Sequence, residues 1–241
     1  MKPLVRATQL EQFRRFMSDK YEYMTEQDVI DTCTGAFEGN VKTRVGSALH
    51  SIVENGTDVI TMSVPAGVRQ FTYYGKPCTE NIPLGKAVNI EGNNIIFDEG
   101  QIALILNYKK SYPYAFHEHR QQKDYGKIVV TGCADMIDGS EIRDIKTKFS
   151  APSDDDYIDS YQWRIYCDIF EADRFSFDLF EFEDYSEPKH LYDVRGLNLR
   201  RHEPIVVYPY DHMHQDIINL IDDFVEFSKS RNFYHLLSTI Q

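Results

Sequence analysis

The middle of the chain constrains the fold most, because three stretches with strand composition follow one another there. They span residues 114–120, 128–137 and 141–146. The last two are separated by little more than Asp138-Gly139, a dipeptide typical of tight hairpin turns. The chain is therefore expected to contain a β-meander at its centre, with strands 128–137 and 141–146 paired as a hairpin.

Helical patterns lie on both sides of this meander. Apolar residues recur at helical spacing over residues 43–55, 157–170 and 211–237, and Phe175, Phe177 and Leu179 alternate as a further strand. Helix, meander, helix, strand and helix together predict an α/β or α+β layered fold with a mixed sheet. We expect one domain over residues 1–241, since no Pro/Gly-rich linker or repeat divides the chain.

Residues 56–98 have a different pattern from their surroundings. Short β-like pieces are punctuated there by glycines and prolines, and Asn93-Asn94 is expected to form a hairpin turn. Asp98 then provides an N-cap for a helix that starts at Glu99. This stretch is interpreted as a β-rich insertion in the domain.

Composition excludes several classes of protein. The chain has 26 Lys+Arg against 38 Asp+Glu, a net charge of −12, so bulk positive charge does not draw it to a partner. The longest clean apolar run, residues 102–106, is far shorter than the roughly 20 residues of a membrane span. No signal-peptide core occurs near the start, which makes the cytoplasm, of a host cell if the gene is viral, the expected location. Nothing in the sequence indicates an oligomer.

The four cysteines, Cys33, Cys78, Cys133 and Cys167, lie far apart without a C-x-x-C pair. Neither a disulfide framework nor a zinc or iron–sulfur site has a signature here. Four reduced thiols are expected.

The segment from Gly132 to Lys148 carries the residues with chemical meaning. The predicted hairpin would bring Asp135 and Asp144 side by side, and strand alternation would place Lys146 on the same face as Asp144. Two neighbouring carboxylates repel each other, and burying each one costs desolvation energy. A divalent cation would resolve that conflict.

Oxygen ligands of this kind suit Mg²⁺ or Mn²⁺, which retain water and bind phosphate groups. Lys146 beside the cation would orient an attacking water, or would deprotonate it if its own pKa were depressed. The pattern thus predicts a hydrolytic phosphodiesterase site.

Four motifs occur in a fixed order around this site: Gly46-x-x-x-His50, Gly132-x-x-Asp135, Asp144-Ile145-Lys146-Thr147 and Gln162-x-x-x-Tyr166. In this order they resemble the PD-(D/E)xK nuclease superfamily, and within it the RecB-like exonucleases and their phage and CRISPR-adaptation relatives. Four ordered motifs are more specific than any single one. The resemblance covers residues 43–55 and 114–182 and implies a restriction-endonuclease-like core with a central mixed sheet flanked by helices. No cysteine follows Cys167, so the iron–sulfur cluster of some members is not expected.

The resemblance implies a set of metal ligands. Asp135 and Asp144 would be the metal-binding carboxylates, His50 a further ligand, and the main-chain carbonyl of Ile145 another. Glu118 corresponds more loosely to a glutamate of many relatives and ranks below these four.

The resemblance also implies the catalytic residues. Lys146 would be the catalytic lysine beside Asp135 and Asp144, while Gln162 and Tyr166 would face the site and the DNA from one helix. Residues four apart do share a helix face, which agrees with that pairing.

Each motif also has a simpler interpretation. The charged hairpin could lie on the surface and hold a solvated salt bridge. His50 could be a helix histidine near the core whose hydrogen bonds are all made. Gln162 and Tyr166 could be the polar rim of an amphipathic helix. Aromatic residues 112–116, beside Lys109, Lys110 and Arg120, could stack nucleic-acid bases. For the aromatic run 175–182, core packing is the better explanation.

The function predicted from these motifs is a metal-dependent deoxyribonuclease, an exonuclease of recombination, replication or repair, and plausibly phage-encoded. DNA is its expected partner, bound through a local basic surface in spite of the acidic total. The alternative from another class is an inactive nuclease-like fold that binds DNA or a protein. Retention of Asp135, Asp144 and Lys146 together argues against that alternative.

Overall fold

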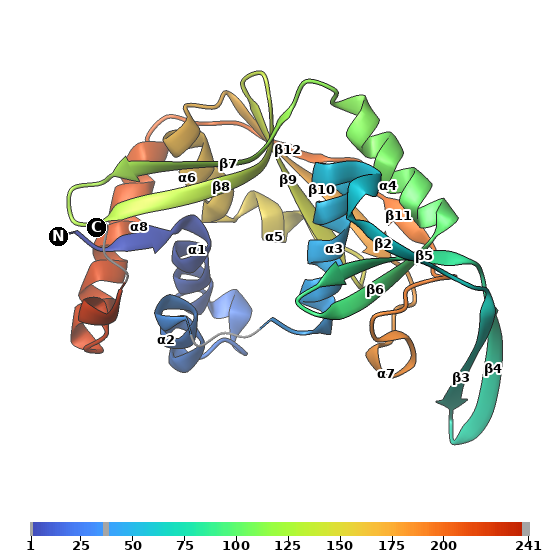
Figure 1. Cartoon of the computed structure of the whole chain (residues 1–241). Coiled ribbons are helices and arrows are strands. Elements are labelled where there is room, and N and C mark those ends of the chain that lie inside the picture. The colour runs from blue at the N-terminus through green and yellow to red at the C-terminus, as the bar shows by residue number, and fades with distance from the viewer. Residues whose placement is uncertain (1, 36–38, 238–241) are drawn as a thin grey trace.

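The computed structural model describes residues 2–35 and 39–237. Within those residues a seven-stranded mixed sheet forms the centre of the molecule, with helices against both faces (Figure 1). Its strands are β1 (Leu4–Arg6), β7 (Phe116–Asp124), β8 (Val129–Asp138), β9 (Glu141–Lys148), β10 (Arg174–Phe182), β11 (Leu199–Arg201) and β12 (Ile205–Val207). The predicted layered α/β class with a central mixed sheet is confirmed.

The sheet combines parallel and antiparallel pairs. The order is β1-β8-β9-β10-β11, with β7 on the other edge of β8 and β12 beside β10. Strand β8 is parallel to β1 and antiparallel to β7 and β9, while β10 is parallel to β9 and antiparallel to β11 and β12. The meander expected at the centre of the chain is thus the β7-β8-β9 part of this sheet.

Two hydrophobic clusters cover the two faces of the sheet. Strand β10 alternates between them: Phe175, Phe177 and Leu179 belong to the first cluster, Phe180 and Phe182 to the second. The first cluster includes helices α1 (Ala7–Phe16), α2 (Glu26–Thr34), α6 (Tyr161–Phe170) and α8 (Met213–Ser230). The second includes α3 (Val41–Asn55) and α4 (Glu99–Ser111). Two shorter helices complete the set, α5 (Asp154–Ile158) and α7 (Glu187–His190).

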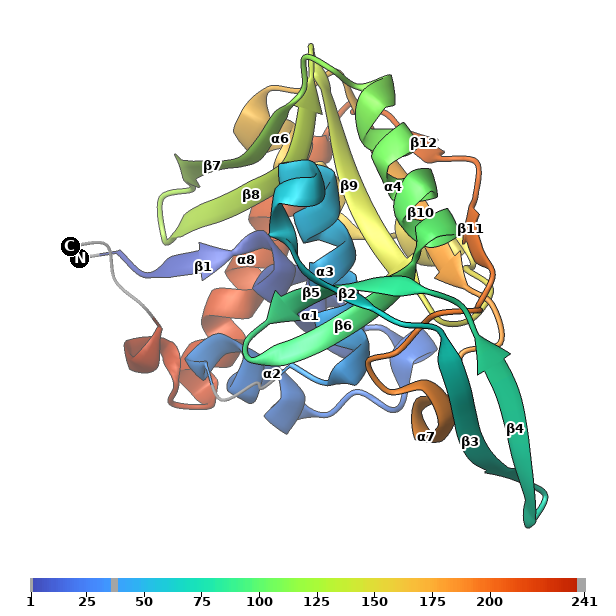
Figure 2. The ribbon, with the colours of Figure 1, turned by 45° about the vertical axis from the view of Figure 1, so that its right-hand side comes forward.

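Five strands occupy the region that was interpreted as an insertion. An antiparallel sheet is formed by β2 (Ile60–Val64), β5 (Gly85–Ile90) and β6 (Asn93–Asp98), and its apolar side packs on α3. Strands β3 (Gly67–Tyr73) and β4 (Lys76–Ile82) pair only with each other among the described strands and extend away from the body (Figures 1 and 2). The chain is therefore β-rich throughout residues 60–98.

Several local boundaries differ from the sequence predictions. The helix expected over 211–237 is α8, which ends at Ser230, and the strand expected over 114–120 is β7, which runs from Phe116 to Asp124. The β5–β6 turn is Glu91-Gly92, with φ of 50° and 82°, and not Asn93-Asn94. The β8–β9 turn is Gly139-Ser140, one residue later than predicted, with the positive φ of 63° carried by glycine. The single helix expected over 157–170 is two helices, because the Ser160 side chain caps α6 by accepting the Gln162 N–H.

The helices that border the site start where a side chain caps them. Asn40 accepts the Thr43 N–H at the start of α3, and Asp98 accepts the Gln101 N–H at the start of α4, as predicted for Asp98. No helix in the described part of the chain has both the length and the hydropathy needed to cross a membrane.

Candidate metal centre

The β8–β9 hairpin opens at the two predicted carboxylates. The ladder consists of the pairs Asp138–Glu141, Ile137–Ile142 and Met136–Arg143, so that Asp135 and Asp144 are the next residues opposite each other. Farther along, the same edge of β8 pairs with β1 instead, over residues 129–131. Figure 2 shows β8 and β9 diverging from their shared turn. The two aspartates therefore lie where the sheet splits.

The Asp135 side chain replaces the missing ladder contact. Its Oδ2 accepts the main-chain N–H of Ile145 at 2.7 Å. Helix α3 lies against β9, and it brings His50 Nδ1 to 3.6 Å from the same carboxylate oxygen. His50 thus lies beside Asp135, and the Ile145 main chain contacts the site through its amide.

Glu118 belongs to this site as well. The β7–β8 register runs through His117–Met136 and His119–Ala134, which puts Glu118 opposite Asp135. Its φ of 48° interrupts the strand at that residue, and such a conformation is uncommon for a residue other than glycine. One ligand atom each from His50, Glu118 and Asp135 lie within 4.8 Å of one another. Glu118 matches the resembling family only loosely in sequence, yet the structure places its carboxylate with His50 and Asp135.

Asp144 is held by two partners. Its side chain is nearly inaccessible, Oδ1 accepts a hydrogen bond from Gln162 Nε2 at 3.0 Å, and Oδ2 lies 2.7 Å from Lys146 Nζ. No donor in the described chain other than this ammonium group reaches Oδ2. The carboxylate thus has room in its coordination for a cation.

The charges of the site perturb one another. Burial raises the pKa of Asp135 to about 6, with Asp144 adding to the rise and His50 opposing it. Burial lowers the pKa of Lys146, but Asp144 and Asp135 outweigh that effect and the net pKa is raised. Lys146 is therefore a stable ammonium ion in the metal-free chain. The expectation that a depressed pKa lets it deprotonate water is wrong for this state, because two anions stabilise its proton.

Tyr166 does not face DNA as the resemblance implied. It is buried on α6, and its hydroxyl donates to the Cys133 carbonyl at 3.0 Å and accepts the Cys133 N–H at 3.3 Å. Burial raises its pKa, with Asp144 contributing. Tyr166 thus positions β8 two residues before Asp135. Gly132 fits this arrangement, because an added Cβ would come within 3.3 Å of the Tyr166 ring.

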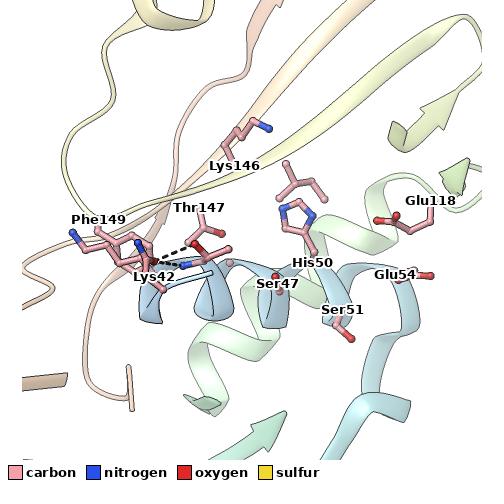
Figure 3. A pocket seen from close by; sticks show the side chains of 13 residues that line it. Lys42, Ser47, His50, Ser51, Glu54, Glu118, Lys146, Thr147 and Phe149 are labelled. Carbon is pink, nitrogen blue, oxygen red and sulfur yellow. Dashed lines mark hydrogen bonds between the residues drawn. The ribbon is translucent and has the colours of Figure 1, made fainter. Parts of the chain in front are cut away.

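An open groove of about 570 Å³ runs along α3 past these residues (Figure 3). Hydroxyl and amide groups from Asn40, Thr43, Ser47 and Ser51 line it, together with Lys42, Phe149, His50, Glu54, Glu118, Ile145, Lys146 and Thr147. A second hollow of about 410 Å³ adjoins it across Lys146 and Thr147 and includes Arg15 and Lys148. An extended ligand could therefore pass over Lys146.

The basic residues that flank the site in sequence divide into two groups. Arg44, Lys123 and Lys127 are in ion pairs with Glu91, Asp168 and Asp222, and Lys109 donates to the carbonyls of Val53 and Glu54. Lys42 and Lys148 line the two hollows, and Lys110 and Arg120 are exposed. Side chains of the second group form no ion pair among the described residues, so they are available to contact an anion, although Glu11, Glu54 and Asp156 also line the two hollows.

The donor set fits a hard divalent cation. Carboxylate oxygens and one imidazole nitrogen converge at the split in the sheet, and oxygen-rich sets favour Mg²⁺ or Mn²⁺. Burying Asp135 and Asp144 together without a cation raises the energy of the site, as the raised pKa of Asp135 shows. A cation there would reverse that penalty.

The sequence matches no protein-family model and no curated protein. Among solved structures, a protein from Eubacterium rectale provisionally described as an exonuclease aligns with a TM-score of 0.49 and 11% identity, over 96% of this chain and 82% of that one. A phage-related exonuclease from Haemophilus somnus 129PT aligns with a TM-score of 0.49 and 11% identity, over 94% of each chain. At that identity the chemistry of this chain can only be inferred from its own side chains.

Proposed function

We propose that the protein is a metal-dependent deoxyribonuclease that hydrolyses phosphodiester bonds, as an exonuclease of recombination, replication or repair, encoded by a phage. One observation carries the proposal: Glu118, Asp135 and Asp144 stand opposite one another on three neighbouring strands, with His50 and Lys146 beside them. Packing does not account for this row, because Asp135 and Asp144 are largely buried side by side, and adjacent buried carboxylates destabilise a fold unless a cation joins them.

The residues that would hold Mg²⁺ or Mn²⁺ are His50, Glu118 and Asp135, with Asp144 contributing Oδ2. The Ile145 carbonyl is a further ligand by resemblance alone. When bound, such a cation lowers the pKa of a coordinated water and offsets negative charge on the phosphate.

The side chains of the chain itself orient the reacting groups. In the metal-free chain Asp144 and Asp135 raise the pKa of Lys146, so it is an ammonium group that can donate a hydrogen bond to the attacking water or to a phosphate oxygen. Gln162 fixes the Asp144 carboxylate through Oδ1 and leaves Oδ2 directed toward Lys146. Tyr166 keeps β8 in place through two bonds to the main chain of Cys133. Lys42 and the hydroxyl groups of α3 would contact phosphates along the groove.

Cleavage of labelled linear DNA in the presence of Mg²⁺ or Mn²⁺ tests the proposal. We expect Asp144→Ala and Lys146→Ala each to slow cleavage about a hundredfold or more, as is usual when a group that stabilises a transition state is removed. Asp138→Asn is the matched control, because Asp138 lies on the same hairpin outside the metal centre and should retain activity. Circular DNA of the same sequence should resist cleavage if the enzyme requires an end.

Two outcomes would contradict the proposal. Cleavage that survives both substitutions would place the activity at another site. DNA binding without cleavage under any metal condition would favour the alternative function, an inactive nuclease-like fold that binds DNA or a protein.

A further inference from the structure

One phenylalanine ring lines the groove that runs along α3 past the metal centre. Phe149 follows directly after β9, and it shares the groove wall with His50, Glu118 and Lys146 (Figure 3). No other phenylalanine, tyrosine or tryptophan of the described chain lines this groove. The groove therefore offers a bound strand a single flat apolar surface.

The Phe149 ring is held in place by two other rings. It stacks on the buried Phe182 ring, with centroids 5.8 Å apart and planes 17° apart. The Tyr185 ring packs against it at a centroid distance of 4.6 Å. A side chain that is already fixed loses little conformational freedom when a ligand binds, so the ring is preorganised for contact.

Lys42 at the start of α3 lies over this ring. Its Nζ is 5.7 Å from the ring centroid, and it forms no ion pair with the described residues. Contact between an ammonium group and an aromatic ring at an exposed site is weak, and the long side chain of lysine is flexible. A base can therefore take the place of Lys42 on the ring while the ammonium group contacts a phosphate of the same strand.

The ring lies at a definite distance from the proposed reaction centre. Ile145 and Phe149 are four residues apart, about 13 Å of extended chain. His50 and Lys42 are eight residues apart on α3, about 12 Å of helix. Phosphates of one DNA strand are spaced about 3.4 Å apart along the axis, so about three or four nucleotides separate Phe149 from a phosphate beside His50.

The groove is sized for one strand. Its volume of about 570 Å³ lies within the range of roughly 300–1,000 Å³ that is usual for small-ligand pockets. Bases inside a duplex already stack on their neighbours and expose only their edges in the grooves. An unpaired base, in contrast, has a free face that stacks on an aromatic ring whatever its sequence.

We propose that Phe149 is the base-stacking residue of the α3 groove. It stacks on an unpaired base about three or four nucleotides from the scissile phosphate, and Lys42 turns to a phosphate beside that base. The inference rests on the proposed function and assigns the substrate class: the strand that lies in the groove is single-stranded.

The test uses a set of single-stranded oligonucleotides, each with 2-aminopurine at one position, because the fluorescence of this base falls when it stacks. Wild-type protein in EDTA and Asp144→Ala protein in Mg²⁺ leave the DNA intact if the proposed function holds. We expect quenching on binding at one position or two adjacent positions. Phe149→Leu should abolish that quenching and weaken binding of the strand about tenfold.

Two variants separate stacking from core packing. Leucine keeps apolar contact with Phe182, and urea unfolding should show that Phe149→Leu is folded. Phe149→Tyr should retain the quenching, since a ring remains. If Phe149 only covered the hydrophobic cluster, Phe149→Leu would change the unfolding midpoint and leave the quenching as it is.

Phe227 on α8 offers a matched control. It is a partly buried phenylalanine with Arg231 over its ring at 5.7 Å, but it packs against the other hydrophobic cluster. Phe227→Leu should therefore leave both quenching and affinity unchanged.

Two results would overturn the inference: no position-specific quenching by the wild type, or equal quenching by folded Phe149→Leu. Either result is distinguishable from failure of the nuclease proposal. A failed stacking residue leaves metal-dependent cleavage of linear DNA intact, whereas a failed nuclease proposal leaves position-specific quenching without cleavage.

Discussion

Glu118 reaches the metal centre because its backbone is left-handed. At a φ of 48° the carboxylate leaves the regular alternation of β7 and joins His50 and Asp135. Strained backbone of this kind costs about 1–3 kcal/mol and is concentrated at functional sites. Glutamate gives no sequence indication of such a conformation, whereas Asp135, Asp144 and Lys146 were predictable because strand alternation and a short turn fix their positions.

The Asp135 carboxyl should make the metal-free protein less stable as pH rises. Its pKa is raised from 3.8 to about 6, so between those values the native state binds more protons than the unfolded state. Stability from this group is complete below pH 4 and is lost as pH rises through 6, by at most about 3 kcal/mol.

Urea unfolding in EDTA at several pH values, with wild type and Asp135→Asn, measures this contribution. The stability of the variant relative to wild type should increase between pH 4 and pH 7. A constant difference over that window would show that Asp135 does not titrate as described.

At the scale of elements, the glycines of two motifs, Gly132 and Gly46, differ in how closely their surroundings pack. Gly132 on β8 faces α6, where an added Cβ would lie 3.3 Å from the Tyr166 ring and 3.4 Å from Phe170. Gly46 on α3 faces Thr147, and a Cβ there would make an ordinary contact at 3.6 Å. The sequence indicates both positions, but only the packed structure shows that the first requires glycine and the second tolerates a methyl group.

Gly132→Ala should destabilise the protein by about 1–3 kcal/mol, because it overpacks the contact between α6 and β8. It should also reduce cleavage, since α6 carries Gln162, which holds Asp144. Gly46→Ala is the control and should stabilise the protein by up to about 1 kcal/mol, as alanine favours a helix interior. Equal effects of the two substitutions on the unfolding midpoint would refute this difference in packing.

Element boundaries show where sequence patterns stop being informative. The helix pattern over 157–170 continues through Ser160, yet the serine side chain starts a new helix there. The turn between β8 and β9 lies at Gly139-Ser140, since glycine takes the positive φ that Asp138 would have needed. Apolar periodicity places an element, while caps and turns decide its ends.

At the scale of the whole molecule, an acidic chain presents a local basic track. Lys42, Lys146 and Lys148 follow the two hollows that meet over β9. This clustering depends on long-range packing of α1, α3 and β9, so composition alone could not predict it. The layered fold with a mixed sheet was predictable, because the alternation of apolar residues in β10 and the short turn between β8 and β9 are patterns of a few neighbouring residues.

Binding of single-stranded DNA should weaken steeply with salt. Each phosphate contact contributes about −0.7 to the slope of log affinity against log salt concentration. Lys42→Ala should make the slope shallower by about that amount, whereas Lys229→Ala on α8, which packs in the other hydrophobic cluster, should not. Fluorescence anisotropy between 50 and 200 mM KCl measures both slopes, and an affinity indifferent to salt would contradict the basic track.

The parting of β8 and β9 has a mechanical consequence. Two strands fixed at a turn behave as the arms of a hinge, so that a small rotation of one displaces its residues in proportion to their distance from the pivot. Asp135 and Asp144 come directly after the last ladder pair, where the displacement is least. The separation of the two acids is therefore the one least sensitive to such a rotation, because the ladder pairs and the turn fix it.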